Sequence, residues 1–111
     1  MSEDLFSNFQ SLDMRVGTVL SAEDFAEARK PAYKLRIDFG DLGVLQSSAQ
    51  VTEVYRADEL PGKQVVAVVN FEPKRIAGFK SECLVLGVDD AEGNVVLLQP
   101  ERPLPNGNRV Y

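Results

Sequence analysis

The sequence predicts a single all-β domain, a five-stranded barrel with a short helix at its N-terminus and another between the third and fourth strands. Three observations predict it. Short apolar segments recur along the 111 residues, glycines lie within or between them, and helical spacing is confined to two short stretches. A chain of this length forms one domain, expected over residues 1–111, with roughly two-thirds of its unfolded surface buried.

The first half of the chain predicts one helix and three strands. Apolar residues at helical spacing in 4–11 indicate a two-turn helix. The stretch 14–25 is a long strand, and Gly17 inside it indicates a bulge or a bend. Residues 32–39 alternate between apolar and charged, which is typical of a half-buried strand. After a turn at 40–43, residues 44–49 return as the third strand.

The second half predicts the remaining barrel elements. Residues 51–60 form the best internal helix candidate, which Pro61 and Gly62 end. The stretches 63–69, 81–88 and 95–98 are apolar enough for strands. This order, with a long bent first strand, a meander and then a helix, matches the oligonucleotide-binding (OB) barrel. A β-sandwich is the alternative, but the helix between the third and fourth strands argues against it.

Composition limits the partners and the compartment. The net charge of −5 argues against a strong, general nucleic-acid binder. Two segments, 29–36 and 74–80, carry bases without acids and can meet as one weak anion-binding patch. The acidic start does not resemble a signal peptide, and no run reaches the ~20 apolar residues of a membrane span. We therefore expect a cytoplasmic protein with no membrane insertion.

Catalysis is not expected from this sequence. It has no histidine, a single cysteine and no glycine-rich phosphate loop, so the usual bases, metal ligands and phosphate cradles are missing. No cofactor or metal site is expected. Cys83 lies inside an apolar stretch and is interpreted as a small buried hydrophobic residue. A binding module is what remains.

The most informative stretch is 70–86, between two apolar strands. Three bases lie within seven residues of one another and alternate with apolar side chains; they are Lys74, Arg75 and Lys80. This mixture suits an anionic ligand with flat faces, such as single-stranded or looped nucleic acid. An equally good interpretation is a solvated loop whose Ile76 and Phe79 pack into the core.

An ordered set of motifs carries a family resemblance. The set comprises Asp13-x-Arg15-Val16-Gly17, Ala32-x-Lys34-Leu35-x-Ile37-Asp38-x-Gly40, Gln46-Ser47-Ser48, Gly62-Lys63-x-Val65…Asn70, Ile76-x-Gly78-x-x-Ser81-Glu82 and Leu97-Leu98-x-Pro100. It resembles the tRNA-binding domain found at the C-terminus of many methionyl-tRNA synthetases and in free-standing proteins. The resemblance covers the chain from about Phe9 onward. The stretches QSSAQ, VVNFEPKRIAGFKSE and VLLQPERPLPNG are most similar to small free-standing bacterial members.

The resemblance implies a set of RNA-binding residues. They are Lys34, Ser48, Asn70, Lys74, Arg75, Lys80, Ser81 and Glu82. For Ser81 and Glu82, hydrogen bonds that fix the loop are as good an interpretation as contacts with bases. Asp13 and Arg15 also belong to the signature, and an intramolecular ion pair is expected for them.

One departure from the synthetase-type pattern concerns RNA affinity. Those members carry a further arginine and a glycine–methionine pair where this chain has Ala77 and Cys83–Leu84. Losing one cation removes one contact that releases a counterion, so RNA binding should be weaker. The departure fits the free-standing members better than a dedicated tRNA carrier.

The resemblance implies a homodimeric chaperone related to protein export that binds unfolded or precursor polypeptides, with tRNA as a further partner. Its polypeptide site is expected at Phe9, Phe71, Ile76 and Phe79. The alternatives are a structure-specific tRNA-binding protein, or synthetase cofactor, and a purely structural assembly domain. Apolar residues on the first helix predict that the helix and the proline-rich tail form the dimer interface.

Overall fold

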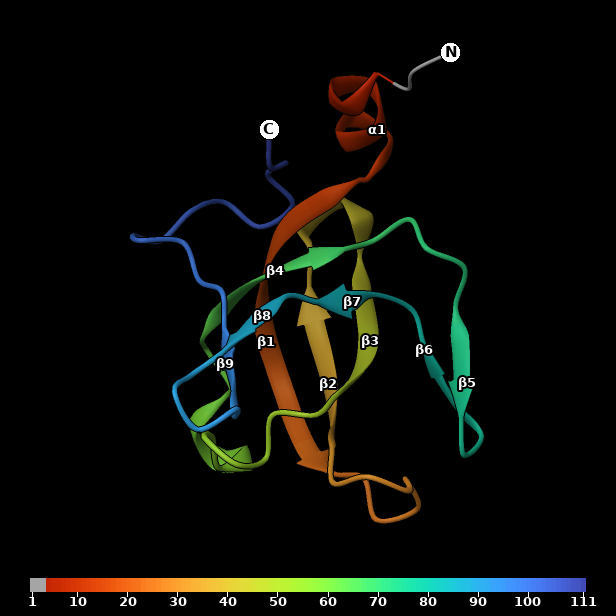
Figure 1. Cartoon of the computed structure of the whole chain (residues 1–111), viewed down its shortest axis with the longest axis vertical. Helices are drawn as coiled ribbons and strands as arrows, with labels where there is room; N and C mark the ends of the chain where they lie inside the picture. The colour runs from red at the N-terminus through yellow and green to blue at the C-terminus, as the bar shows by residue number, and fades with distance from the viewer. Residues whose placement is uncertain (1–3) are drawn as a thin grey trace.

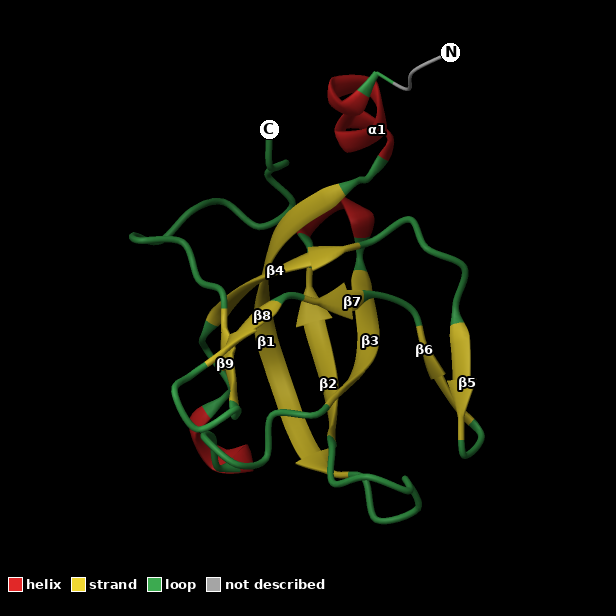
Figure 2. Ribbon diagram, in the orientation of Figure 1, coloured by secondary structure: helices red, strands yellow, loops and turns green. Residues whose placement is uncertain are grey.

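The computed structural model describes residues 4–111, which form short strands joined by loops and a few helical turns (Figures 1 and 2). Five strands form one antiparallel, nearly closed sheet in the order β3-β2-β1-β4-β7. Their bounds are Met14–Asp24 for β1, Tyr33–Asp38 for β2, Val44–Ala49 for β3, Gln64–Val68 for β4 and Leu84–Val85 for β7. The predicted all-β barrel with OB-type order is confirmed.

Two small hairpins and three helical elements complete the fold. The hairpins are β5 (Lys74–Ile76) with β6 (Phe79–Ser81), and β8 (Gly87–Asp89) with β9 (Val95–Leu97). The helical elements are α1 (Leu5–Ser11) and two 3-10 helices, η1 (Gly40–Leu42) and η2 (Ala57–Glu59). None of the helices within residues 4–111 has the length and apolar character to cross a membrane. The acidic start of the sequence includes residues 1–3, which lie outside the described part of the chain.

Strand β1 is shared by both halves of the barrel, because it pairs with β2 and with β4. The register shifts between Val19 and Ser21, so the bulge lies at Leu20 and not at Gly17. Glycine is needed at position 17 for packing rather than for a bulge. A Cβ there would lie 2.7 Å from Ile37 Cγ2 and 2.7 Å from the Phe39 ring. The glycine lets the core side chains of β2 pack directly against the β1 backbone.

The core lies between the strands and follows the predicted alternation on β2. Leu35, Ile37 and Phe39 are fully buried, while Arg36 is exposed. Ser47 is a buried polar residue of the core, and its hydroxyl donates to the Cys83 carbonyl at 2.9 Å. This bond links β3 to the segment that enters β7, so it helps to close the barrel.

Three predicted elements differ in extent. The helix expected at 51–60 is the short 3-10 helix η2, because Val51 and Leu60 are both buried and fix the ends of the segment in the core. The single strand expected at 81–88 is divided among β6, β7 and β8. The basic loop at 74–80 is itself a hairpin, with a two-residue turn whose Ala77 and Gly78 both have positive φ.

Helix α1 extends from the barrel close to the C-terminus (Figure 1). Its N-cap is Asp4, whose side chain accepts a hydrogen bond from the Phe6 amide. None of the helix residues is buried, although Leu5 and Phe6 are large and apolar. An amphipathic helix of two turns is not stable on its own in water, so this face needs a cover.

Candidate functional site

The β5–β6 hairpin separates its three bases onto two faces. Directly paired residues share one face of an antiparallel pair. Lys74 pairs with Ser81 and Ile76 with Phe79, so these residues face the barrel. Arg75 pairs with Lys80 on the opposite face, and both are exposed. The predicted basic cluster is therefore divided, and Lys74 is the base that lies on the face with the apolar side chains.

The base of the hairpin is fixed to the edge of β3. The Ser48 amide donates to Ser81 Oγ at 3.0 Å, and the Gln46 amide donates to Glu82 Oε1 at 3.1 Å. The Glu82 amide donates to the Gln46 carbonyl at 2.8 Å. The two side chains thus take the place of a neighbouring strand on this edge. This geometry favours the interpretation of Ser81 and Glu82 as residues that fix the loop.

The tip of the hairpin packs against the far end of β1. The rings of Phe79 and Phe25 meet edge to face with 5.3 Å between their centroids. Lys34 Nζ lies 4.9 Å from the Phe25 centroid and 5.4 Å from that of Phe79. Both distances are within the range of cation–π contacts.

A basic hollow of about 260 Å³ lies between the hairpin and the loop that joins β1 to β2. Its cationic residues are Arg29, Lys30 and Lys74, and no acid is among the described residues that line it. The two basic segments of the sequence therefore meet here. Arg29 and Lys30 were not among the predicted site residues. The signal for them was the acid-free stretch 29–36, which identifies charge but not the side of the barrel on which it lies.

A second hollow of about 250 Å³ lies beside the first and is mostly apolar. It is lined by Ser48, Phe71, Glu72, Lys74, Ile76, Ser81, Glu82, Cys83 and Leu84. Three of these, Ser48, Lys74 and Ile76, also line the basic hollow. Six of the twelve predicted RNA and polypeptide residues therefore line two adjoining hollows that share one wall. Arg75, Lys80 and Phe79 lie on the hairpin outside both linings, and Lys34 lies on β2 with its ammonium at the hairpin tip.

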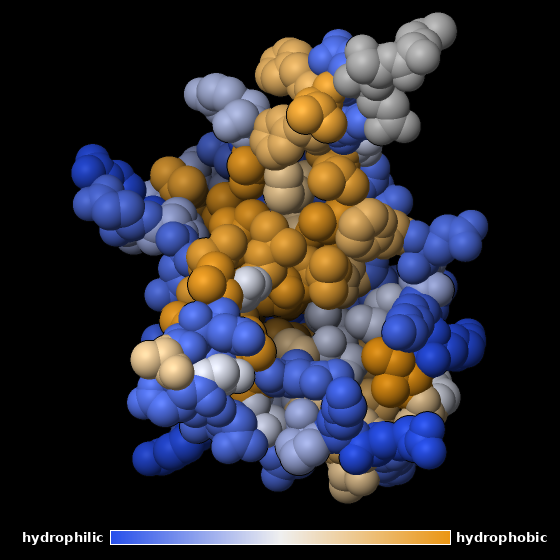
Figure 3. Space-filling model, in the orientation of Figure 1, coloured by the Kyte–Doolittle hydropathy of each residue, from blue (hydrophilic) through white to orange (hydrophobic). Residues whose placement is uncertain are grey.

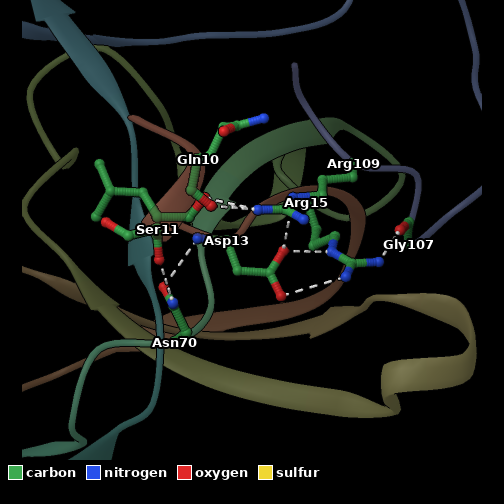
Figure 4. A network of polar contacts seen from close by, with 8 residues as sticks. Gln10, Ser11, Asp13, Arg15, Asn70, Gly107 and Arg109 are labelled. Carbon is green, nitrogen blue, oxygen red and sulfur yellow. Dashed lines mark hydrogen bonds and ion pairs between the residues drawn. The ribbon is translucent and has the colours of Figure 1, made fainter. Parts of the chain in front are cut away.

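Two predicted site residues, Asn70 and Phe9, lie away from the hairpin and its hollows. The Asn70 side chain accepts from the Asp13 amide at 3.0 Å and donates to the Ser11 carbonyl at 2.9 Å, so it ties the end of β4 to the start of β1 (Figure 4). Phe9 lies on α1 and borders a separate hollow near the C-terminus, together with Tyr111.

The Asp13–Arg15 ion pair expected from the sequence is present (Figure 4). Arg15 also donates to the Gly107 carbonyl at 3.0 Å, and Arg109 Nε lies 3.6 Å from Asp13 Oδ1. The hydrogen bond from Arg15 lowers the pKa of Asp13. This network ties the start of β1 to the C-terminal segment.

Cys83 is buried, as predicted, beneath the start of β7. Burial raises the pKa of its thiol to about 12. The thiol is therefore protonated at neutral pH, and the residue serves as packing rather than as a nucleophile.

Comparison with known proteins places the chain in a family. The model of the putative tRNA-binding domain matches residues 14–109. This chain belongs to that family. The crystal structure of the chaperone CsaA from Bacillus anthracis is 58% identical, covers 100% of this chain and 99% of its own, and superposes with a TM-score of 0.91. The CsaA chaperone protein from Picrophilus torridus is 48% identical with full coverage of both chains and a TM-score of 0.89.

Matches to synthetases cover only one domain of those enzymes. The methionine–tRNA ligase of Methanococcoides burtonii is 36% identical over 106 residues, which is 96% of this chain but 15% of the ligase. That of Methanothrix thermoacetophila is 40% identical over 102 residues, again 15% of the ligase. The chain is therefore a CsaA-like protein of the tRNA-binding-domain family, and it aligns with none of the remaining length of those ligases.

Proposed function

We propose that this protein is a cytoplasmic chaperone that holds extended polypeptides during protein export. The observation that carries the proposal is the apolar hollow between β3 and the hairpin, beside which Phe71 and Leu84 are about half exposed. Apolar residues also cover much of one face of the molecule (Figure 3). Exposed apolar surface of this kind marks sites that bind proteins. The similarity to CsaA chaperones supports the same function.

The shape and charge of the hollow favour an extended, largely uncharged segment. Lys74 and Glu72 both line it, so its charge is mixed. The Glu82 carboxylate already accepts the Gln46 amide. Because neither sign of charge dominates, the main attraction must come from apolar side chains of the bound polypeptide.

A peptide array tests this function. Phe71→Ser and Leu84→Ser, each checked for an intact fold by circular dichroism, should weaken binding several-fold. Leu42→Ser is the matched control, because Leu42 is exposed to a similar extent on η1. Equal binding by all three variants would remove the hollow from the site, and a wild-type protein that binds no peptide would end the chaperone hypothesis.

A second function, tRNA binding, is favoured by the basic hollow. Three cations that line one hollow can contact about three phosphates, so the slope of log K against log salt should be about −2 to −3. Affinity should be modest, because the net charge of −5 repels an anionic ligand at long range.

The salt dependence of tRNA affinity locates this second site. Replacing Arg29 and Lys30 together by alanine should flatten the slope by about 1.5, since each lost phosphate contact accounts for 0.7–0.9. Arg102→Ala is the matched control, because Arg102 is paired with Glu101 and lines a different hollow. An unchanged slope in the double variant would place tRNA binding elsewhere on the protein.

We also propose that the protein is a homodimer with α1 at the interface. The exposed Leu5 and Phe6 lie on a helix that has no buried residue, and the fully exposed Tyr111 shares a hollow with Phe6. A second copy of the chain is the partner that would cover this apolar surface.

A further inference from the structure

We infer that Lys34 is a positioning residue, whose ammonium group holds the tip of the hairpin against the barrel and does not itself contact RNA phosphate. Lys34 lies near the start of β2, where it pairs with Glu23 of β1 and Ser48 of β3. Its ammonium lies over the rings of Phe25 and Phe79, which meet where the hairpin tip touches the barrel. One cation thus joins Phe25, at the end of β1, to Phe79 on β6.

The hairpin depends on side chains for its position. Among residues 4–111, β5 and β6 pair only with each other, and a two-stranded hairpin alone is marginally stable. Hydrogen bonds from β3 hold its base, and the Gln46 side chain adds one to the Lys80 carbonyl at 2.9 Å. At the tip, the aromatic pair with Lys34 is the contact that fixes Phe79 on Phe25.

The charge of Lys34 is directed toward the rings. Glu23 is its direct cross-strand neighbour, yet none of the ion pairs found within residues 4–111 involves Lys34. The negative faces of the two rings occupy the ammonium instead. Lys34 is also absent from the described lining of the basic hollow. The two ring faces are therefore the contacts that position this ammonium.

The contact has a consequence for binding, which rests on the proposed tRNA function. Phe25 begins the loop that carries Arg29, and Phe79 faces the same side of the hairpin as Lys74. Holding the two rings together therefore holds Lys74 next to Arg29 and Lys30, around one hollow. Lys34 acts on RNA through the spacing of these other cations.

The salt dependence of tRNA affinity separates this role from a phosphate contact. If Lys34 positions the hairpin, Lys34→Met should weaken tRNA binding about 2- to 5-fold at every salt concentration. The slope should not change, because binding brings the loosened hairpin back into place and the same three cations meet phosphates in the complex. Lys34→Arg should restore affinity, since a guanidinium also binds to ring faces. If Lys34 contacts a phosphate, Lys34→Met should flatten the slope by about 0.7–0.9, and that result would overturn the inference.

Hydrogen exchange tests the same contact without RNA. Lys34→Met and Phe79→Leu should each raise the exchange rates of hairpin amides, and the double variant should exchange no faster than the faster single variant, because both remove one contact. Arg36→Met is the matched control, since Arg36 lies two residues along β2 and is exposed. Hairpin exchange that Lys34→Met leaves unchanged would refute the inference. Absence of tRNA binding by the wild type would refute only the proposed tRNA function, because exchange still reports the contact.

Discussion

Single polar side chains around the hairpin mainly organise the fold. Ser81 and Glu82 bond to the edge of β3, and Asn70 joins two backbone segments. Each satisfies backbone groups that a neighbouring strand does not pair, and an unpaired buried backbone group costs about 1–3 kcal/mol. A family signature can therefore consist of residues that shape a site as well as residues that contact the ligand.

Cys83 should resist alkylation in the folded protein. With a thiol pKa of about 12, its thiolate fraction at pH 8 is roughly 10⁻⁴, against about a quarter for an ordinary thiol. We expect iodoacetamide to react on the order of 10³ times more slowly than with the same protein in urea, as measured by mass spectrometry. Equal rates in the two states would show that the thiol is accessible and not buried.

Ionisation of Asp13 should make the free energy of unfolding depend on pH in the acidic range. Its pKa is lowered in the folded state, mainly by the hydrogen bond from Arg15, so the unfolded state binds more protons as the pH falls. The contribution is complete above the unfolded pKa of about 4 and is lost as the pH falls through the folded pKa. We expect Asp13→Asn to lower the unfolding free energy by about 1 kcal/mol at pH 7 and by less at pH 3.

Urea unfolding at the two pH values measures this difference. Asp89→Asn provides the control, because Asp89 is an exposed carboxyl on β8. A loss from Asp13→Asn that is equal at pH 3 and pH 7 would contradict the assignment to the ionised carboxylate.

At the scale of the element, close packing against β1 limits the choice of residue. Ile37 and Phe39 fill the space that a Cβ on residue 17 would need, so this position of β1 requires glycine. The β5–β6 hairpin shows a second constraint, since Ala77 is the non-glycine residue with positive φ in the described chain. A turn of this type needs two such residues, and alanine accepts the geometry less readily than asparagine.

Gly17→Ala should destabilise the barrel. The added methyl group would lie 2.7 Å from two core side chains that belong to a closely packed sheet, and overpacking of this kind costs about 1–3 kcal/mol. Glu23→Ala, an exposed change on the same strand, should stay within about 0.5 kcal/mol. Thermal or urea unfolding measures both, and equal stability of the two variants would mean that the core adapts to the methyl group.

At the scale of the whole molecule, the N-terminal helix α1 has no buried residue. Asn70 and Arg109 bond to carbonyls at the C-terminal end of α1 and just beyond it. Its apolar side chains are exposed next to the C-terminal Tyr111. A barrel of 111 residues therefore leaves apolar surface at this end that a second copy can bury.

The double variant Phe6→Glu/Phe9→Glu should dissociate the proposed dimer. Two charges on the exposed face of α1 would have to be desolvated in the interface, while the barrel core is untouched. Sedimentation should then show the monomer mass of 12.2 kDa instead of twice that value. Leu42→Glu, on η1, should leave the dimer intact. A double variant that remains dimeric and folded would remove α1 from the interface.

The sequence alone was sufficient to predict the barrel, because the alternation of apolar residues and the spacing of glycines that indicate strands are local patterns. The buried face of β2, the buried Cys83 and the Asp13–Arg15 pair all followed from neighbouring residues. The two-residue offset of Asp13 and Arg15 puts both side chains on one face of an extended strand, so local geometry was sufficient there.

Only the tertiary structure decided how the candidate site is arranged. The pairing register of the hairpin places Lys74 on one face and Arg75 and Lys80 on the other. No local pattern in that basic stretch predicted a hairpin. The closing of the barrel brings Arg29 of one loop beside Lys74, across a long sequence separation. These long-range contacts decide which basic residues lie together, because the position of a base in the sequence does not specify the face on which it lies in the folded protein.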